Sequence, residues 1–391
     1  MFRRMDLLLL GIVIGLTLFG LAMIASVSVF KSYQLTQHMV DQGLRLSPSN
    51  SLFLQRSSLH VFFGFLVMLL TAGIPYRLWE RLARPLFLLT IILLIAVFLP
   101  GIKNTYGTAN SWLVLGGFSF QPSELLKITL VFYLAVWLQK REQLVGTWKE
   151  GFLPFVTLLL LSTLLVAIQP DLGSFLVLTA IATTMFFIAG GNILHLCMGG
   201  LLAGIMGLPL ILSKQYVRDR FTAWLTPSDP RITETIGFQI KQALIAIGSG
   251  GVFGVGYGKS IQKFGYLPEV QADMVFAAMA EELGFFRMLI ILTMYAILIV
   301  RGYKIAREAP DRFGFLVAAG ITTWIAFQSI INMSINLALF PLTGLTLPFI
   351  SYGGSSLVTT LAGVGILLNI SMHSTSGSLA DRRPKRQLKM A

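Results

Sequence analysis

Charged residues are scarce in this sequence. Asp, Glu, Lys and Arg make up 12% of its 391 residues, whereas a typical soluble domain has about 25%. Cysteine is nearly absent too, and the single Cys197 excludes a disulfide within the chain. The four histidines are scattered and form no metal-ligand spacing such as HExxH. The composition therefore excludes a soluble globular enzyme and a disulfide-stabilised domain.

Apolar residues take the place of charge. They account for 55% of the chain, and the mean hydropathy is +0.77. A membrane-spanning helix needs about 20 apolar residues. On this criterion the sequence predicts ten spans, at 7–30, 58–75, 84–100, 122–139, 152–168, 172–190, 192–213, 274–300, 313–340 and 355–372. The expected fold is an all-α polytopic membrane domain over residues 1–373, with no cleaved signal peptide.

Lys and Arg concentrate in alternate connecting segments. With the N-terminus inside, the cytoplasmic cations are Arg3, Arg4, Arg77, Arg81, Arg84, Lys140, Arg141, Lys149, Arg301, Lys304, Arg307 and Arg312, followed by a basic tail at 374–391. An even number of spans then places both termini in the cytoplasm. The same rule explains much of the formal charge of +13, so nucleic acid is not an expected partner. We expect the tail to be disordered.

The longest connection, 214–272, falls on the outer side and is basic. It carries seven cations (Lys214, Arg218, Arg220, Arg231, Lys241, Lys259, Lys263) and four acids (Asp219, Asp229, Glu234, Glu269). A basic outer loop beside lipid indicates an anionic partner such as phosphate or pyrophosphate, with phospholipid headgroups as the alternative. The other polar outer segment, Leu35–Phe53, is expected to be irregular.

Three acids mark the stretch at 248–284, where a glycine-rich loop meets an apolar segment. Carboxylates in membrane segments are costly and indicate functional sites. A nucleotide-binding P-loop is excluded, because Phe253 stands where Gly258-Lys259-Ser260 would require glycine. Asp273 opens the apolar segment and is either a helix N-cap or a general base at the membrane surface.

Glu281 and Glu282 lie about 12 Å deeper in a helix that starts at Asp273. Adjacent helical residues point about 100° apart, so the two acids cannot share one partner. We therefore expect them to hold helices together, with a buried base as partner.

Three further segments carry polar residues in apolar surroundings. Glu124 and Lys127 are i,i+3 neighbours that could form a local ion pair. Asp171 follows Gln169-Pro170 and suits a helix cap. The run Leu347–Ser356 is predicted to be non-helical, and forms either one wall of a substrate cavity or a simple turn.

Taken together, these motifs resemble the SEDS family of bacterial peptidoglycan polymerases (FtsW, RodA and SpoVE). The matching segments are 121–127 (QPSE-x-x-K), 169–173 (QPDLG), the basic start of the large loop at Tyr216, Arg218 and Arg220, the core at 237–284, and 347–356 (LPFISYGGSS). The resemblance covers nearly the whole chain, with five motifs in the family's order.

The resemblance implies a glycosyltransferase that polymerises lipid II. Asp273 would be the general base that activates the 4-hydroxyl of the acceptor GlcNAc, and the donor would be the glycan on undecaprenyl pyrophosphate. Residues expected to contact substrate are Lys127, Glu124, Arg218, Arg220, Lys259, Lys263, Ser351 and Ser355, and those expected to be structural are Glu281, Glu282 and Asp171.

The resemblance also implies cofactors, partners and a location. It is compatible with a divalent cation, Mg²⁺ or Mn²⁺, although no ligand set for one can be identified in the sequence. The expected partners are a class B penicillin-binding protein and other divisome or elongasome membrane proteins. The expected location is the bacterial cytoplasmic membrane at the division septum.

The sequence departs from the family pattern at several positions. Gln271-Ala272 replaces the usual His-Thr, Ser111 stands at the position of an arginine, and Phe286-Arg287 follows the EELG motif. Segment 348–351 and the basic tail favour FtsW and septal synthesis, whereas 169–172 is typical of RodA and elongation. We favour FtsW. A lipid II flippase and a scaffold that recruits the transpeptidase are the alternative functions.

Overall fold

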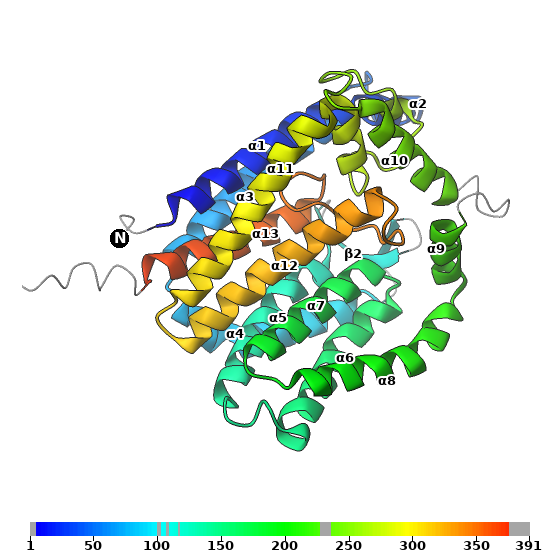
Figure 1. The fold of residues 1–391 in the computed structure, drawn as a ribbon. Coiled ribbons are helices and arrows are strands. Elements are labelled where there is room, and N and C mark those ends of the chain that lie inside the picture. The colour runs from blue at the N-terminus through cyan, green and yellow to red at the C-terminus, as the bar shows by residue number, and fades with distance from the viewer. Residues whose placement is uncertain (1–4, 100–102, 107–108, 116–117, 227–235, 375–391) are drawn as a thin grey trace, which may run out of the picture.

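The computed structural model describes residues 5–99, 103–106, 109–115, 118–226 and 236–374. The described part is mostly helical, as predicted (Figure 1). The first four helices are α1 (Leu7–Val27), α2 (Val29–Asp41), α3 (Leu52–Gly73) and α4 (Arg77–Ala96). An antiparallel sheet of β1 (Lys103–Tyr106), β2 (Ala109–Leu115) and β3 (Phe118–Phe120) follows, in that spatial order. Most of the predicted tail lies outside the described residues.

The second part of the chain returns to helices. They are α5 (Pro122–Lys140), a π-helical turn (Trp148–Phe152) continuing into α6 (Leu153–Ile168), α7 (Leu172–Ile188), α8 (Ile193–Leu212), α9 (Gln215–Leu225) and α10 (Ile236–Gly250). A 3₁₀ turn (Gln262–Phe264) precedes α11 (Val275–Arg307), α12 (Arg312–Asn336) and α13 (Gly354–Met372).

Each of the ten predicted spans coincides with one of these helices. Within the described residues, six helices are long and apolar enough to cross a membrane: α1, α3, Trp148–Ile168, α11, α12 and α13. Two shorter apolar helices, Leu172–Ile188 and Ile193–Ile205, add to them. The count of ten crossings and their orientation stay predictions.

The expectation of an irregular segment at Leu35–Phe53 is wrong in its first half. Helix α2 extends to Asp41 and buries Ser32 and Thr36, which lie one turn apart. Ser32 Oγ accepts a hydrogen bond from the backbone N–H of Phe53, and Thr36 Oγ1 accepts one from Ser49 N–H. These bonds fix a helix that is too polar for a hydropathy criterion to find.

The large connection at 214–272 is also more ordered than a loop, because α9 and α10 lie within it. Its acids Asp229 and Glu234 and its cation Arg231 lie outside the described residues. The three-stranded sheet at 103–120 was not predicted, since its strands are short and carry no membrane signal.

Helices α12 and α13 form the centre of the bundle. The apolar windows of α12 and α13 are 78% and 89% buried, against 22% for α3. Figure 1 shows α12 lying between α11 on one side and α5 and α7 on the other, and contacts join α12 to all three. The interior is partly polar, because Gln328, Asn332 and Asn336 of α12 are fully buried.

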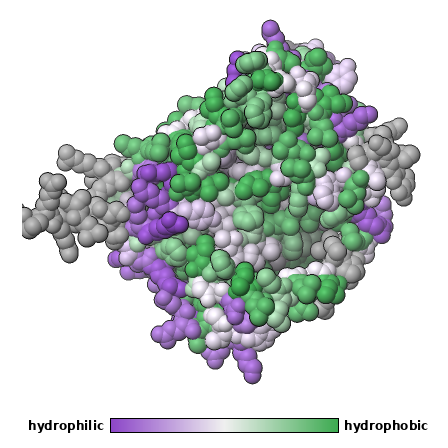
Figure 2. Space-filling model, viewed as in Figure 1, coloured by the Kyte–Doolittle hydropathy of each residue, from purple (hydrophilic) through white to green (hydrophobic). Residues whose placement is uncertain are grey.

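Both ends of the described chain lie at one end of the bundle (Figure 1). The Asp6 backbone N–H donates to Ser371 Oγ at 3.2 Å, and the Asp6 carboxylate pairs with Arg301 at 2.7 Å. On the face shown in Figure 2, hydrophobic side chains fill the middle, and hydrophilic ones gather at the lower left and along the right. This apolar band between two polar ends is what a bilayer-spanning bundle requires.

Helix α11 is broken at Gly284, where φ is 74° and ψ is 176°. The segment 251–256 pairs with the backbone groups that the break exposes. Val255 and Gly256 N–H donate to the carbonyls of Glu281 and Glu282, each at 3.0 Å, and Phe285 N–H donates to Gly251 O at 2.9 Å. The break is tolerated because its polar groups are satisfied within the protein.

Gly284→Ala should destabilise the protein. An added Cβ would lie 2.1 Å from Gly254 N, and the positive φ alone costs about 1–3 kcal/mol. The control is Gly11→Ala in α1, where a Cβ meets nothing within 4 Å. We expect a lower thermal unfolding midpoint for Gly284→Ala only, and equal midpoints for both variants would contradict this role of the break.

Candidate active site

Asp273 lies in the turn directly before α11 and is 7% exposed. Its main-chain carbonyl accepts hydrogen bonds from the side-chain amides of Asn332 and Asn336, both at 2.9 Å. The Asn336 Oδ1 accepts a bond from the backbone N–H of Ala277 at 3.0 Å. Asn336 therefore caps the start of α11 from a neighbouring helix, and the N-cap position itself is Met274. Asp273 is held by its backbone, and its carboxylate does not cap the helix.

The carboxylate of Asp273 is buried and incompletely paired. Its Oδ1 atom has no hydrogen-bond partner within the described residues. Burial raises the pKa of Asp273 to about 7, and the negative charge of Glu269 adds to the rise. Hydrogen bonding to its own backbone N–H, the positive charge of Arg220 and hydrogen bonding to the Met274 backbone N–H act in the opposite direction. A carboxyl group with a pKa near neutrality can both accept and release a proton at physiological pH.

Arg220 of α9 lies within electrostatic reach of two acids, Asp273 and Asp171. Its Nη1 atom is buried and has no hydrogen-bond partner within the described part of the chain. Helix α9 is anchored beside the site by Trp224, whose indole N–H donates to Ala338 O at 2.8 Å. The arrangement leaves an unpaired guanidinium donor within electrostatic reach of a carboxylate that also keeps an unpaired oxygen.

Asp171 joins this region to α5 and α7. Its Oδ1 accepts the Ser174 N–H at 2.9 Å and so caps α7, as the sequence suggested. Its Oδ2 accepts hydrogen bonds from Gln121 Nε2 at 3.0 Å and Ser123 Oγ at 3.1 Å. Asp171 thus caps α7 and also links it to the start of α5. Its carboxylate accepts hydrogen bonds from three donors, on Ser174, Gln121 and Ser123.

Glu124 and Lys127 form an ion pair of 2.7 Å, and both side chains are buried. The Lys127 ammonium also donates to Gln328 Oε1 at 2.9 Å and lies 5.6 Å from the ring centroid of Trp324. Gln328 in turn donates to Thr346 O at 3.0 Å. This pair therefore ties α5 to α12 and to the segment before α13.

Of the run 347–356 that was predicted to be non-helical, residues 347–353 are non-helical, and the last three residues begin α13. Hydrogen bonds join this part of the chain to Gln271, near the site, and to Gln121, before α5. The Tyr352 N–H donates to Gln271 O at 2.8 Å, two residues from Asp273. Ser351 Oγ accepts the Leu347 N–H at 2.8 Å and closes the turn, whereas Ser355 Oγ accepts the Gln121 N–H at 3.2 Å. The segment fixes the position of Asp273 relative to α5.

Glu281 and Glu282 belong to a separate cluster at the break in α11. Glu282 accepts hydrogen bonds from Ser26 Oγ of α1 at 2.6 Å and pairs with the buried Lys263 at 3.2 Å. Glu281 accepts the Ser260 hydroxyl at 2.5 Å, and Glu282 accepts the Ser260 backbone N–H at 3.4 Å. The prediction that the two acids cannot share a partner is therefore wrong, because the side chain and the backbone of Ser260 bond different carboxylates. The two acids hold the 258–263 segment against α1 and α11. The ammonium of Lys263 is occupied here, although the sequence suggested a substrate contact.

The other two cations of the large connection that were expected to contact substrate, Lys259 and Arg218, are exposed. Lys259 lies on the surface next to this cluster, and Arg218 donates to Gln215 Oε1 on the outside of α9. The structure thus brings Asp273, Arg220 and Asp171 together, links them by hydrogen bonds to Glu124, Lys127 and Ser355, and keeps Lys259, Lys263, Glu281 and Glu282 apart.

The sequence analysis missed the polar stripe of α12. Gln328, Asn332 and Asn336 recur every four residues in an otherwise apolar helix, so they share one face. That spacing is the signal that could have identified them.

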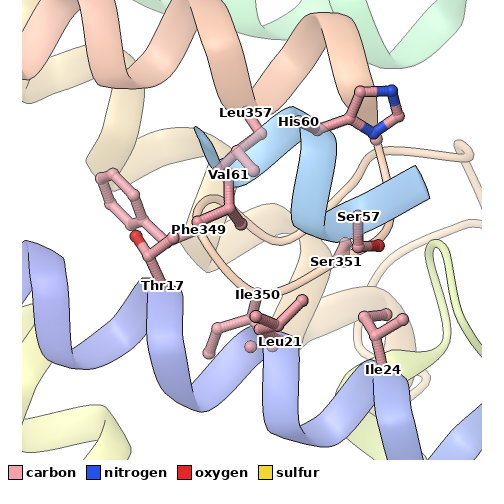
Figure 3. Close-up of a pocket in the computed structure, with 12 residues that line it drawn as sticks. Thr17, Leu21, Ile24, Ser57, His60, Val61, Phe349, Ile350, Ser351 and Leu357 are labelled. Atoms are coloured by element: carbon pink, nitrogen blue, oxygen red, sulfur yellow. The ribbon is translucent and has the colours of Figure 1, made fainter. Parts of the chain in front are cut away.

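A cavity of about 10 Å³ lies behind the 347–353 segment, between α1 and α3. Figure 3 shows His60 and Ser57 of α3 and Thr17 of α1 around it, with Ser351 at its side. About 10–15 Å³ accommodates one water molecule. The cavity is too small for a sugar.

Residues suited to hold a divalent cation are not clustered at this site. Within the described residues, no group of three or more His, Cys, Asp or Glu side chains is placed to bind a metal ion. We therefore derive no step through a metal.

Lys127→Met should lower the stability by about 3–5 kcal/mol, because it leaves the buried charge of Glu124 unpaired. The double variant Glu124→Gln/Lys127→Met should recover part of the loss. Lys140→Met, at the exposed end of the same helix, is the control and should change stability by less than about 0.5 kcal/mol. Thermal unfolding in one detergent measures all three. A Lys127→Met midpoint equal to that of the control would show that the pair does not support the fold.

Comparison with known proteins covers nearly the whole chain. The family model FTSW_RODA_SPOVE, described as "Cell cycle protein", matches residues 6–376. The chain is 41% identical over 374 residues to a probable peptidoglycan glycosyltransferase FtsW of Geobacter sulfurreducens, covering 94% of this chain and 95% of the relative. It is 38% identical over 372 residues to stage V sporulation protein E of Bacillus subtilis, covering 94% and 97%.

Solved structures share the fold. A chain from a peptidoglycan synthase complex superposes with a TM-score of 0.75 and 27% identity, over 94% of this chain and 98% of that one. The rod shape determining protein RodA of Thermus thermophilus superposes with a TM-score of 0.67 and 27% identity, over 95% and 98%. The resemblance drawn from the motifs is therefore confirmed.

Proposed function

The chain belongs to the FtsW/RodA/SpoVE family, and from this premise we propose that it polymerises the glycan chains of peptidoglycan from lipid II with Asp273 as general base. It is an integral membrane protein and a peptidoglycan glycosyltransferase. The finer assignment rests on one observation, a buried carboxylate with a raised pKa and a free oxygen.

The proposed step is a transfer of the growing glycan to an incoming lipid II. The Asp273 carboxylate takes the proton from the 4-hydroxyl of the acceptor GlcNAc while that oxygen bonds to the anomeric carbon of the donor sugar. The bond between the anomeric carbon and the pyrophosphate oxygen breaks, and undecaprenyl pyrophosphate leaves with the electron pair. General-base catalysis of this kind contributes about 10²–10⁴-fold in rate.

The leaving group is an anion, so a cation should lie beside Asp273. Arg220 meets this requirement, because its guanidinium is within electrostatic reach of Asp273 and carries an unpaired donor. Arginine binds phosphate oxygens with paired N–H donors. We assign the pyrophosphate contact to Arg220, with Arg218 and Lys259 of the same connection as exposed cations that attract the lipid-linked anion.

The names of the relatives support a proposal for the biological setting. Several of them carry the name FtsW, which supports septal synthesis over RodA-type elongation. One solved neighbour comes from a complex that coordinates polymerization and crosslinking. We propose a class B penicillin-binding protein as partner and the division septum of the cytoplasmic membrane as location.

Asp273→Asn should abolish polymerisation of labelled lipid II by the purified protein with its transpeptidase, lowering the rate by about 10²-fold or more. Stability should not fall. The folded-state pKa of Asp273 exceeds its ordinary value of 3.8, so the ionised carboxylate costs stability as the pH rises from about 4 through about 7. Asparagine removes that cost.

The matched control is Asp219→Asn, an acid on α9 whose carboxylate accepts a bond from Gln215. It should leave the polymerisation rate unchanged. Normal polymer from Asp273→Asn would refute the general-base assignment. If the variant also moves lipid II across vesicles at the wild-type rate, transport rather than catalysis is the function.

The polymerisation rate should depend on pH through Asp273. A base acts when deprotonated, so the rate should fall about tenfold per pH unit below pH 7 and level off above it. Glu269→Gln removes a negative charge that raises the pKa of Asp273, and should move the half-maximal rate to lower pH. Asp219→Asn again serves as control. A rate that is flat from pH 5 to 8 (about three units) would contradict the role of a base with this pKa.

A further inference from the structure

A second polar site lies between α4 and α5, at the end of the bundle where the described chain begins and ends. A cavity of about 130 Å³ opens there, lined by Arg84, Tyr133, Val136, Trp137, Lys140 and Arg141. The Tyr76 N–H, just before α4, donates to Asn369 Oδ1 at 2.9 Å, which places this end of α4 beside the C-terminal part of α13. The site is thus remote in sequence and in position from Asp273.

The lining carries three cations and no acid. None of the three forms an ion pair within the described residues, and the nearby acid Glu142 is taken by Arg312 at 2.5 Å. Glu80 lies one turn before Arg84 on α4, but no ion pair joins them in the described structure. The guanidinium of Arg141 lies 4.9 Å from the ring centroid of Trp137. Uncompensated positive charge around a cavity favours an anionic ligand.

The dipole of helix α5 accounts for two of the three cations that line the cavity. Lys140 is in the last turn of α5 and Arg141 is its C-cap residue, where cations offset the helix dipole. Arg84 gains nothing in this way, because it lies inside α4 and away from both helix ends. A cation placed there faces the cavity without a structural partner.

The cavity, at about 130 Å³, is large enough to hold a phosphate group. Cavities of about 150 Å³ hold a benzene molecule, which is larger than a phosphate. The aromatic rings of Tyr133 and Trp137 line the same cavity. Such rings collect at the level of lipid headgroups.

An exposed apolar stripe leads away from the cavity along α4. Leu88, Ile92 and Ile95 follow Arg84 at helical spacing and are 61%, 62% and 50% exposed. A ligand bound at Arg84 with its charged group would therefore lie along these side chains with its apolar part. Basic pockets between membrane helices at the cytoplasmic side bind anionic lipid headgroups.

We propose that this pocket binds the phosphate of an anionic phospholipid, whose acyl chains lie along Leu88, Ile92 and Ile95 of α4. The phosphate contacts Arg84, Lys140 and Arg141. The site is independent of the reaction at Asp273. It fits the predicted orientation, which places this end of the bundle in the cytoplasm.

The test is lipid binding to the purified full-length protein in detergent, followed by native mass spectrometry. The probes are phosphatidylglycerol, phosphatidylcholine and inorganic phosphate. The pocket variant is Arg84→Gln/Lys140→Gln/Arg141→Gln. The control variant Lys149→Gln/Lys304→Gln/Arg307→Gln removes three exposed cations that do not line the cavity.

Wild type should bind phosphatidylglycerol more tightly than phosphatidylcholine. The pocket variant should bind it about tenfold to hundredfold more weakly, and the control variant within about twofold of wild type. Should the triple variant unfold, Lys140→Glu at the exposed rim gives the same answer, with Lys149→Glu as its control.

Three results would overturn the proposal. Equal weakening by the pocket and control variants would show a general surface-charge effect. Equal affinity of wild type for the two phospholipids would show no headgroup recognition. Complete displacement of phosphatidylglycerol by equimolar inorganic phosphate would show that the pocket binds free phosphate and that the acyl chains contribute nothing.

Discussion

The architecture depends on the satisfaction of polar groups away from water. In a bilayer no solvent is present to pair with a buried donor or acceptor, so each must find a partner within the protein. Two places in the interior of this bundle illustrate that constraint. The break in α11 is paired by segment 251–256, and the buried Glu282 is paired with Lys263 and Ser26. Buried atoms without a partner do remain within the described residues, among them Asp273 Oδ1 and Glu124 Oε2, and of these two carboxylates only Glu124 has an ion-pair partner, Lys127.

The buried polar side chains of helix α12 pair with groups at the site. Asn332 and Asn336 hold the backbone of Asp273, and Gln328 receives the ammonium of Lys127. The carboxylate is therefore placed by its main chain, and its side chain remains available. A catalytic group held in this way needs little reorganisation when substrate binds, which is the advantage of a preorganised site. The buried ion pair Glu124–Lys127 holds α5 against α12, and we assign it no step in the reaction.

Much of the fold could be predicted from the sequence, because apolar runs of sufficient length mark helices directly. The ten predicted apolar runs coincide with ten helices. The i,i+3 spacing of Glu124 and Lys127 correctly predicted their ion pair. Helices α2, α9 and α10 were not predicted, since α2 and α9 are polar and α10, with 15 residues, is too short for a membrane span. Local spacing could not place Arg220 within electrostatic reach of Asp273 either, because this depends on how α9 packs against α10 and on the bond from Trp224 to Ala338 beyond the end of α12. Lys263 is the opposite kind of error. Its charge predicted a contact with substrate, whereas its ammonium pairs with Glu282 inside the protein.

The central claim is that Asp273 titrates near neutral pH and that this titration controls the reaction. Infrared difference spectroscopy of wild type against Asp273→Asn measures it directly, through the C=O stretch of the protonated carboxyl group. The account predicts a band lost on raising the pH with a midpoint near 7, absent from Asp273→Asn, and coincident with the rise in polymerisation rate. A midpoint near the ordinary value of about 4 would contradict it.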